Sequence, residues 1–333
     1  MKLNTRSLLS PLVVAGTLFA SASAVQAQES WRVGGAVYGL QNEYAQRWSK
    51  DLESHPAIAS GLVDLNIFDG RYDQSTQSAQ FDNMITQQYD AAIYVPIDSN
   101  ACAGVIQRAL DANLPVIGSN GPCDTDLSVS YIGSDDVEAG RRVAQAVIEN
   151  LPDGGGVVVF QGPVGQLGAI QRGQGIDEVL AQHSEIELLE AKTANWSRSE
   201  AFALMQNWLT AYPGQIKGVI AQNDEMGLGA IAAMKAAGID PETIPVAGID
   251  GVTDAIVAVS EGEMVMTIAQ DSLAQAQGAL DITLRHLIGS GYEPQSVIWD
   301  TYAESMPWGD GTDKLYSVPW TFITSENAAD FLK

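Results

Sequence analysis

Blocks of apolar and polar positions alternate along the chain, and they predict strands and helices in turn. Short apolar runs bounded by Gly, Pro, Asn or Asp are typical of buried strands, and each is followed by a longer segment with helical spacing. In the first part of the chain the predicted strands are residues 32–38, 62–68, 91–95 and 115–118, and the predicted helices are 43–52, 74–88 and 102–112. This alternation favours a parallel sheet with helices on both faces.

A second series of the same kind begins after Gly133. Its predicted strands are residues 157–161, 186–191, 218–222, 246–249 and 266–269, and its predicted helices are 135–151, 171–183, 197–211, 225–237, 253–261 and 273–288. Residues 292–333 are rich in Trp, Pro, Gly and Tyr, which indicates a loop before a final strand at 320–324. Two α/β units predict two lobes with a cleft between them. Ligands of such sheets bind beyond the carboxyl ends of the strands, so the loops there are the candidate site.

The first residues have the layout of a secretory signal peptide. Lys2 and Arg6 precede an apolar run at 8–19, and small residues lead to Val25-Gln26-Ala27. The run is too short to span ~30 Å of hydrocarbon. We therefore expect cleavage after Ala27, with residues 1–27 removed and the rest exported to the periplasm.

The exported part is large and strongly acidic. The 333 residues carry a net charge of −24 and are 46% apolar, and the predicted signal peptide contains no acidic residue. A prior of ~150 residues per domain predicts two globular domains. The charge argues against binding to nucleic acid or anionic membranes, and we interpret it as a property of the surface.

Neither a metal site nor catalytic machinery is indicated. A zinc site needs about four N or S ligands, whereas the two cysteines have none of the three histidines nearby. In an oxidising compartment Cys102 and Cys123 could form a disulfide, with free thiols as the alternative. The chain lacks G-x-S-x-G, H-E-x-x-H and Walker A motifs, and residues 162–168 lack the dinucleotide-binding spacing. We expect no cofactor, no metal and no catalytic residue.

The loops after the predicted strands carry the most specific motifs. The sequence AQNDEMGLGA at 221–230 resembles the AQNDEMALGA signature of ribose-type periplasmic sugar-binding proteins. AGIDG at 247–251 resembles that family's VGFDG, and TIAQ at 267–270 its TIAQ. QRGQG at 171–175 resembles ERGEG, and NLPVI at 113–117 resembles NIPVI. The motifs follow the family's order over most of the exported chain.

This resemblance implies the type I periplasmic-binding fold, with two Rossmann-like lobes joined by three crossings near 134–135, 270–271 and 319–320. The N-terminal lobe is then 28–134 plus 271–318, and the C-terminal lobe 135–270 plus 319–333. The implied function is that of a monomeric substrate-binding protein of a carbohydrate ABC transporter. It would close on a monosaccharide or polyol and deliver it to the permease in the inner membrane.

The resemblance also implies the ligand-binding residues, which are Asn42, Tyr44, Asn120, Arg172, Trp196, Asn223, Asp250 and Gln270. Their chemistry suits a polyol, because Asp accepts hydrogen bonds, Arg donates them in a fixed fork, and amides do both. An aromatic face covers the C–H side of a sugar ring.

The chain departs from the family pattern at two positions. Asn120-Gly121 replaces an Asp-Arg pair, and Ala45 replaces the second ring of an aromatic pair. We therefore expect a protein with the fold of the ribose-binding proteins that binds a different ligand. Tyr38, Tyr72 and Trp308 are candidates for the missing ring.

Some site residues also have structural interpretations. Asp250 and Asn223 could cap the helices that follow them. Arg172 could form a surface salt bridge, and Tyr44 could be a packed residue. Trp196 lies in an Asn-Trp-Ser turn, where a buried ring is not expected.

Three other functions remain to be compared with transport. A protein of the same fold could serve a chemoreceptor or bind a non-sugar signal. A secreted sugar-modifying enzyme would need a nucleophile and base, for which no motif is present. A ribose-type transcription regulator would need a DNA-binding helix-turn-helix where this chain has the signal peptide.

Overall fold

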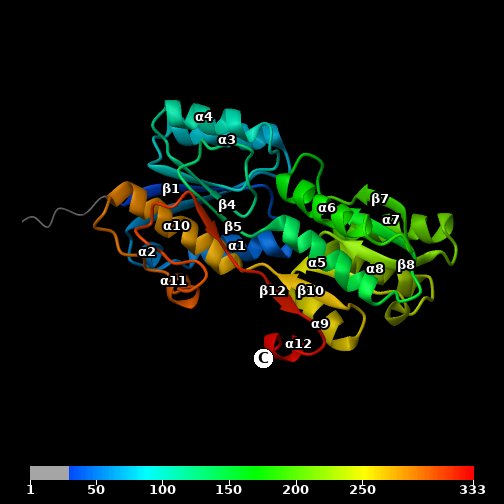
Figure 1. The fold of residues 1–333 in the computed structure, drawn as a ribbon. Coiled ribbons are helices and arrows are strands. Elements are labelled where there is room, and N and C mark those ends of the chain that lie inside the picture. Colours follow the sequence, from blue (N-terminus) through cyan, green and yellow to red (C-terminus); the bar gives the residue numbers. More distant parts are fainter. Residues whose placement is uncertain (1–29) are drawn as a thin grey trace, which may run out of the picture.

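The structure is a computed structural model that describes residues 30–333, so the predicted signal peptide at 1–27 lies outside the described residues. The chain forms two α/β lobes, each built on a six-stranded sheet (Figure 1). The alternation of strands and helices predicted from the sequence is confirmed. Within the described part of the chain, no helix has both the length and the apolar character needed to cross a membrane.

The first lobe contains a sheet whose strands are all parallel. In spatial order these are β11 (Leu315–Ser317), β5 (Tyr131–Gly133), β4 (Val116–Ser119), β3 (Ala91–Tyr94), β1 (Trp31–Val37) and β2 (Val63–Asp69). On one face lie α1 (Glu43–Glu53) and α10 (Ser272–Ile288), and on the other α3 (Gln74–Thr86) and α4 (Cys102–Asp111). Two short helices, α2 (Pro56–Ala59) and α11 (Ile298–Thr301), complete this lobe.

The second lobe repeats the plan with one antiparallel edge strand. Its order is β12 (Thr321–Ile323), β10 (Met266–Ala269), β9 (Val246–Asp250), β8 (Ile216–Ala221), β6 (Gly155–Gln161) and β7 (Ile186–Thr193). On one face pack α5 (Asp136–Glu149) and α6 (Leu167–Leu180), and on the other α7 (Arg198–Ala211), α8 (Asp224–Ala236) and α9 (Thr253–Glu261). A 3-10 turn at Pro241–Thr243 precedes β9, and α12 (Ala328–Phe331) ends the chain. Only β12 runs antiparallel to its neighbour β10 within this sheet.

The chain passes between the two sheets three times. It leaves the first sheet after β5, returns from β10 to α10, and crosses again from β11 to β12 (Figure 1). The first and third crossings lie side by side, because Val318 N donates to the Gly133 carbonyl (2.8 Å) and Trp320 Nε1 to the Asp135 carbonyl (2.7 Å). Just after the second crossing, Gln275 Nε2 donates to Ser134 Oγ (3.1 Å) of the first. The residue limits of the lobes given above stay a prediction.

The segment after residue 292 is more ordered than its composition predicted. It contains α11 and β11, and β11 extends the first sheet by pairing with β5. Both strands have three residues, too few for an alternating pattern to reveal. Trp308 packs on Trp299 with ring centroids 4.6 Å apart, in a cluster with Tyr292 and Tyr316. Trp308 is therefore a packing residue and does not supply the missing ring of the candidate site.

A fully buried carboxylate, Asp281 on α10, anchors this segment. It accepts hydrogen bonds from Tyr292 Oη (2.5 Å) and Trp299 Nε1 (2.7 Å), and from the backbone amides of residues 295 and 296. His55 also faces it, with Nε2 3.1 Å from Oδ1. Because His55 Nδ1 accepts from the Ala57 amide (3.0 Å), its proton is on Nε2 and is donated to Asp281.

The two cysteines form a disulfide, as the export context predicted. It joins the first residue of α4 to the loop after β4, with α-carbons 6.0 Å apart and the partners 21 positions apart in sequence. A loop of this length corresponds to about 3 kcal/mol in the chain-entropy model. The bond restrains the loop that carries Asn120 and Gly121.

Replacing Asp281 by Asn should lower the free energy of unfolding by about 3 kcal/mol. One of the two carboxylate oxygens would become an amide that faces hydrogen-bond donors, leaving them unpaired. Urea unfolding followed by circular dichroism measures the loss, and exposed Asp300→Asn on α11 is the matched control.

The pH dependence of this loss has a defined sign. Burial alone would raise the pKa of Asp281, but hydrogen bonds from His55, Gln295 and Tyr292 lower it below its ordinary value. The stabilisation is therefore present above the ordinary pKa of Asp and disappears as pH falls through the folded-state pKa. A variant within 1 kcal/mol of the wild type at neutral pH would contradict this role.

Candidate functional site

A cavity lies between the lobes, where the carboxyl ends of both sheets meet. All eight residues predicted from the resemblance line it, and so do Tyr38, Gly121, Asp136, Gln166 and Gly168. The structure thus brings the predicted residues of both lobes to one place. Within residues 30–333 no cluster of three or more His, Cys, Asp or Glu is arranged to hold a metal.

Asn42 organises the aromatic part of the wall from the first lobe. It is the N-cap of α1, where its Oδ1 accepts from the Ala45 amide (2.8 Å). The Nδ2 group then donates to Tyr72 Oη (2.7 Å) and lies 3.3 Å from Tyr38 Oη. Tyr38 lines the cavity and Tyr72 supports it, with ring centroids 5.4 Å apart. Of the three candidates for the missing ring, Tyr38 is the one that lines the cavity.

Asn120 connects the first lobe to the hinge. Its φ of 57° is left-handed, a conformation that Asn tolerates better than most residues. The Nδ2 group donates to Gln270 Oε1 (2.8 Å) and to Tyr44 Oη (3.1 Å). Tyr44 is buried and also bonds Gln275, so it is both a packed residue and a wall of the cavity.

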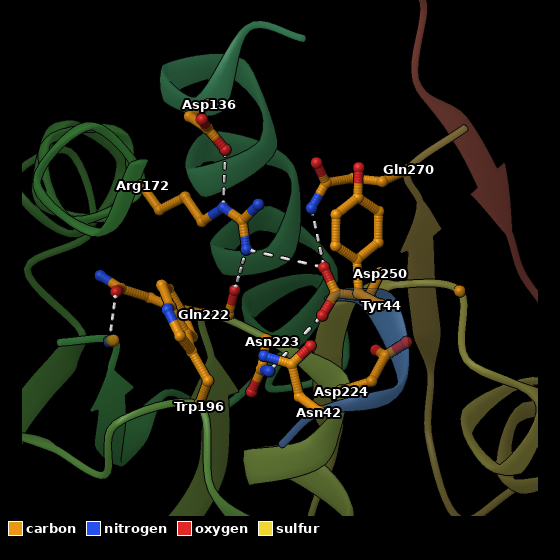
Figure 2. Close-up of polar contacts among 12 residues, drawn as sticks. Asn42, Tyr44, Asp136, Arg172, Trp196, Gln222, Asn223, Asp224, Asp250 and Gln270 are labelled. Atoms are coloured by element: carbon orange, nitrogen blue, oxygen red, sulfur yellow. Dashed lines mark hydrogen bonds and ion pairs between the residues drawn. The ribbon is translucent and has the colours of Figure 1, made fainter. Parts of the chain in front are cut away.

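Arg172 on α6 is the cation of the site. It is only 6% exposed, so its interpretation as a surface salt bridge is wrong. Its Nε donates to Asp136 Oδ1 (2.7 Å) and its Nη1 to the Gln222 carbonyl (2.6 Å), as Figure 2 shows. Asp136 was missed from the sequence, although an acidic residue in the first turn of a helix directly after a hinge crossing is a usable indication.

Asp250, at the end of β9, faces Arg172 across the cavity (Figure 2). Its Oδ1 accepts from Gln270 Nε2 (2.8 Å) and lies 4.0 Å from Arg172 Nη1. Asn223 Nδ2 lies 3.4 Å from Oδ2. The N-cap of α9 is Val252, so the helix-cap interpretation of Asp250 is wrong.

Asn223 combines both roles considered for it. Its Oδ1 accepts from the Met226 amide (3.0 Å) and caps α8, while its amide group faces Asp250 in the cavity. The helix start thus fixes the direction in which the Nδ2 group points.

Burial raises the pKa of Asp250 to about 6, although Arg172 and Gln270 act to lower it. Directly behind it, Asp224 is fully buried and both its oxygens accept from Thr267 Oγ1 (2.8 and 2.7 Å). Burial and the charge of Asp250 raise the pKa of Asp224 to about 7. Ionisation of these two carboxylates is therefore less favourable than ionisation of an Asp side chain in water.

Trp196 lines the cavity but is only 7% exposed, contrary to the expectation for its turn. It has a left-handed φ of 59°, which turns the indole inward from the loop after β7. Its Nε1 donates to Gln166 Oε1 (2.6 Å), and a side chain at Gly162 would overlap the ring. Gln166 was missed from the sequence because nothing local marks a residue that meets Trp196 only in the folded lobe.

The fold is that of a two-lobed α/β protein, and the candidate ligand site lies between the lobes. The family model described as periplasmic binding protein domain matches residues 33–291, and the chain therefore belongs to that family. This membership and the relatives below confirm the resemblance and the fold predicted from the sequence.

Two relatives have names that describe small ligands. The chain is 39% identical over 210 residues to a xylitol-binding protein of Mycolicibacterium smegmatis, a match that covers 63% of this chain and 60% of that protein. It is 32% identical over 206 residues to the ribose import binding protein RbsB of Escherichia coli, covering 62% of this chain and 68% of that protein. The first match thus spans less than two thirds of the relative's length.

The fold is also that of a solved solute-binding protein. An ABC transporter solute-binding protein from Bacillus halodurans with bound myo-inositol superimposes with a TM-score of 0.80 at 25% identity. The likeness covers 92% of this chain and 98% of that one. Both lobes and their connections are included in this likeness.

A neutral polyol bound at this site should bind more weakly as pH falls below about 6. The charged form of Asp250 is the better acceptor for hydroxyl groups, and its pKa of about 6 sets the midpoint. Isothermal titration calorimetry from pH 5 to 8 should show Kd rising by up to about tenfold per pH unit below the midpoint. Asp250→Asn should bind weakly with a flat profile, whereas equal Kd values at pH 5 and 7.5 in the wild type would contradict the assignment.

The same raised pKa has the opposite effect on the stability of the ligand-free protein. The folded state holds the Asp250 proton more tightly than the unfolded chain does. This contribution to stability is therefore lost as pH rises from the ordinary pKa of Asp through about 6.

Proposed function

We propose that the chain is the substrate-binding component of a carbohydrate ABC transporter that captures an uncharged monosaccharide or polyol in its interlobe cleft. After export and removal of residues 1–27, it would work in the periplasm and deliver the ligand to the permease. The observation that carries the proposal is a cavity between the lobes in which hydrogen-bonding groups and aromatic rings from both lobes converge.

The polar groups of this cavity suit hydroxyl groups. Asp250 accepts, Arg172 donates, and Asn42, Asn120, Asn223 and Gln270 offer amides that do both. Tyr38, Tyr44 and Trp196 supply apolar ring surface for the C–H groups of a sugar or cyclitol. The names of the xylitol- and ribose-binding relatives and the bound myo-inositol of the solved structure support the same ligand class.

The charges argue for a neutral ligand over an acidic one. Asp136 takes the Nε group of Arg172 in a buried pair, so this cation is already neutralised. Asp250 then remains as a buried charge beside the ligand. A sugar acid or sugar phosphate would bring a like charge next to it, which costs binding energy.

The cavity lining supports binding over catalysis. It contains no Ser, Thr, Cys, Lys or His, so it offers no nucleophile–base pair of the usual kinds. Both carboxylates are held in hydrogen bonds to neighbouring side chains. A chemoreceptor-serving protein would bind the same ligand class, and nothing in the cavity favours that partner.

A thermal-shift panel of xylitol, ribose, arabinose, glucose, galactose and myo-inositol, with glucuronate and gluconate as acidic counterparts, tests the proposal. A ligand at 100 times its Kd should stabilise the folded protein by about 2.7 kcal/mol, and the acids should give no shift. Asp250→Ala and Arg172→Ala should each abolish the shift, because losing one charged partner in a closed site costs about 2–5 kcal/mol.

Exposed Asp153→Ala and Arg108→Ala are the matched controls and should keep the shift. A panel with no binder, or a shift that survives both site variants, would overturn the proposed ligand class or the assigned residues respectively. Conversion of a bound sugar to a new product would instead favour an enzyme.

A further inference from the structure

The lobes touch beside the cavity through a residue that does not line it. Arg47 lies on α1 of the first lobe, one turn beyond Tyr44. Its Nη2 donates to the Asp250 carbonyl (2.7 Å) and its Nη1 to the Gly251 carbonyl (3.0 Å), both in the second lobe. A guanidinium presents two parallel N–H groups in a rigid fork, which suits two successive carbonyl oxygens.

The backbone that Arg47 holds is strained. Asp250 has φ of 124° and Gly251 φ of 61°, and the first of these is unfavourable for any residue with a side chain. This backbone conformation sets the direction of the Asp250 carboxylate. A group that stabilises the turn therefore also stabilises the orientation of a proposed ligand-binding side chain.

The two lobes hold different atoms of this turn. Within the second lobe the amides are bonded, with Gly251 N donating to Thr267 Oγ1 (3.2 Å) and Val252 N to Asp224 Oδ2 (3.0 Å). The carbonyls of residues 250 and 251 are bonded by Arg47 from the other lobe. The turn thus has its full set of partners only when the lobes are together.

Among the described residues, Arg47 makes no hydrogen bond within its own lobe. Within the described chain both of its hydrogen bonds cross the cleft, and its buried Nε has no partner. The guanidinium carbon lies 5.9 Å from the Tyr44 ring centroid, so this ring guides the side chain across the cleft. Nearby, the Thr253 amide lies 3.4 Å from Glu43 Oε1 and adds a second contact between the same elements.

We propose that Arg47 is a positioning residue that couples closure of the lobes to the integrity of the ligand site. On closure its guanidinium takes the two carbonyls of the 250–251 turn and holds the Asp250 carboxylate toward the cavity. Its positive charge beside the turn also favours the charged form of Asp250. The effect of Arg47 on ligand binding rests on the proposed function, whereas its effect on closure of the lobes does not.

The test compares Arg47→Met, Arg47→Lys and the control Arg108→Met, which changes an exposed arginine of the same lobe. Dissociation of the panel sugar with the largest thermal shift is followed by stopped-flow tryptophan fluorescence. Arg47→Met should release it roughly 10- to 100-fold faster with little change in association rate, because two charge-assisted bonds are lost from the closed form. Arg47→Lys should recover part of the loss, since one ammonium cannot bond both carbonyls as the fork does.

A structural role without coupling predicts a different result. In that case Arg47→Met would lower the thermal stability of the ligand-free protein as much as that of the complex and leave the dissociation rate unchanged, which would overturn the proposal. Small-angle scattering separates the two inferences. If no sugar binds the wild type, the proposed function fails. The role of Arg47 is then tested on the ligand-free protein by scattering, where the wild type should be more compact than Arg47→Met. Identical scattering curves for the two proteins would overturn the coupling.

Discussion

A buried guanidinium sets the layout of the second lobe's wall of the cleft. Removing a charge from water is costly unless it is paired and hydrogen-bonded, so Arg172 requires acceptors on several sides. It finds Asp136 on α5, the Gln222 carbonyl after β8 and Asp250 at the end of β9. One cation thus draws together three elements that are far apart in the sequence.

Close packing of α5 on α6 makes this pairing possible. A side chain at Gly140 would overlap the Arg172 carbonyl oxygen, and one at Gly175 would overlap that of Val137. With glycine at both positions the two helix backbones are in contact, and Asp136 comes within 2.7 Å of Arg172. Small residues at a helix interface therefore decide the electrostatics of the site. Because Asp136 already neutralises Arg172, we propose an uncharged ligand for this cavity.

Several polar residues of the cavity also stabilise the fold. Asn42 and Asn223 cap helices with one end of the amide and turn the other end toward the cavity or its aromatic wall. Asn120 holds Gln270 from across the hinge. Such double use fixes the orientation of each group before a ligand arrives, which reduces the entropy lost on binding. The closed arrangement adds contacts such as Arg47 to the 250–251 turn, so ordering of the site and approach of the lobes occur together.

The sequence by itself determined the succession of strands and helices, because that succession depends on local periodicity and on turn residues. Through the family resemblance it also supplied eight of the positions that line the cavity, and most of these lie at or near the strand ends that a parallel sheet gathers at one edge. Only the tertiary structure decided that Asp136, Gln166 and Tyr38 join them, that Trp196 is buried, and that Trp308 packs elsewhere. Three-residue strands such as β5 and β11 could not be predicted from the sequence either. The physical reason is the same in each case: these features depend on partners distant in sequence, and burial and pairing of a polar or aromatic group exist only once those partners have met.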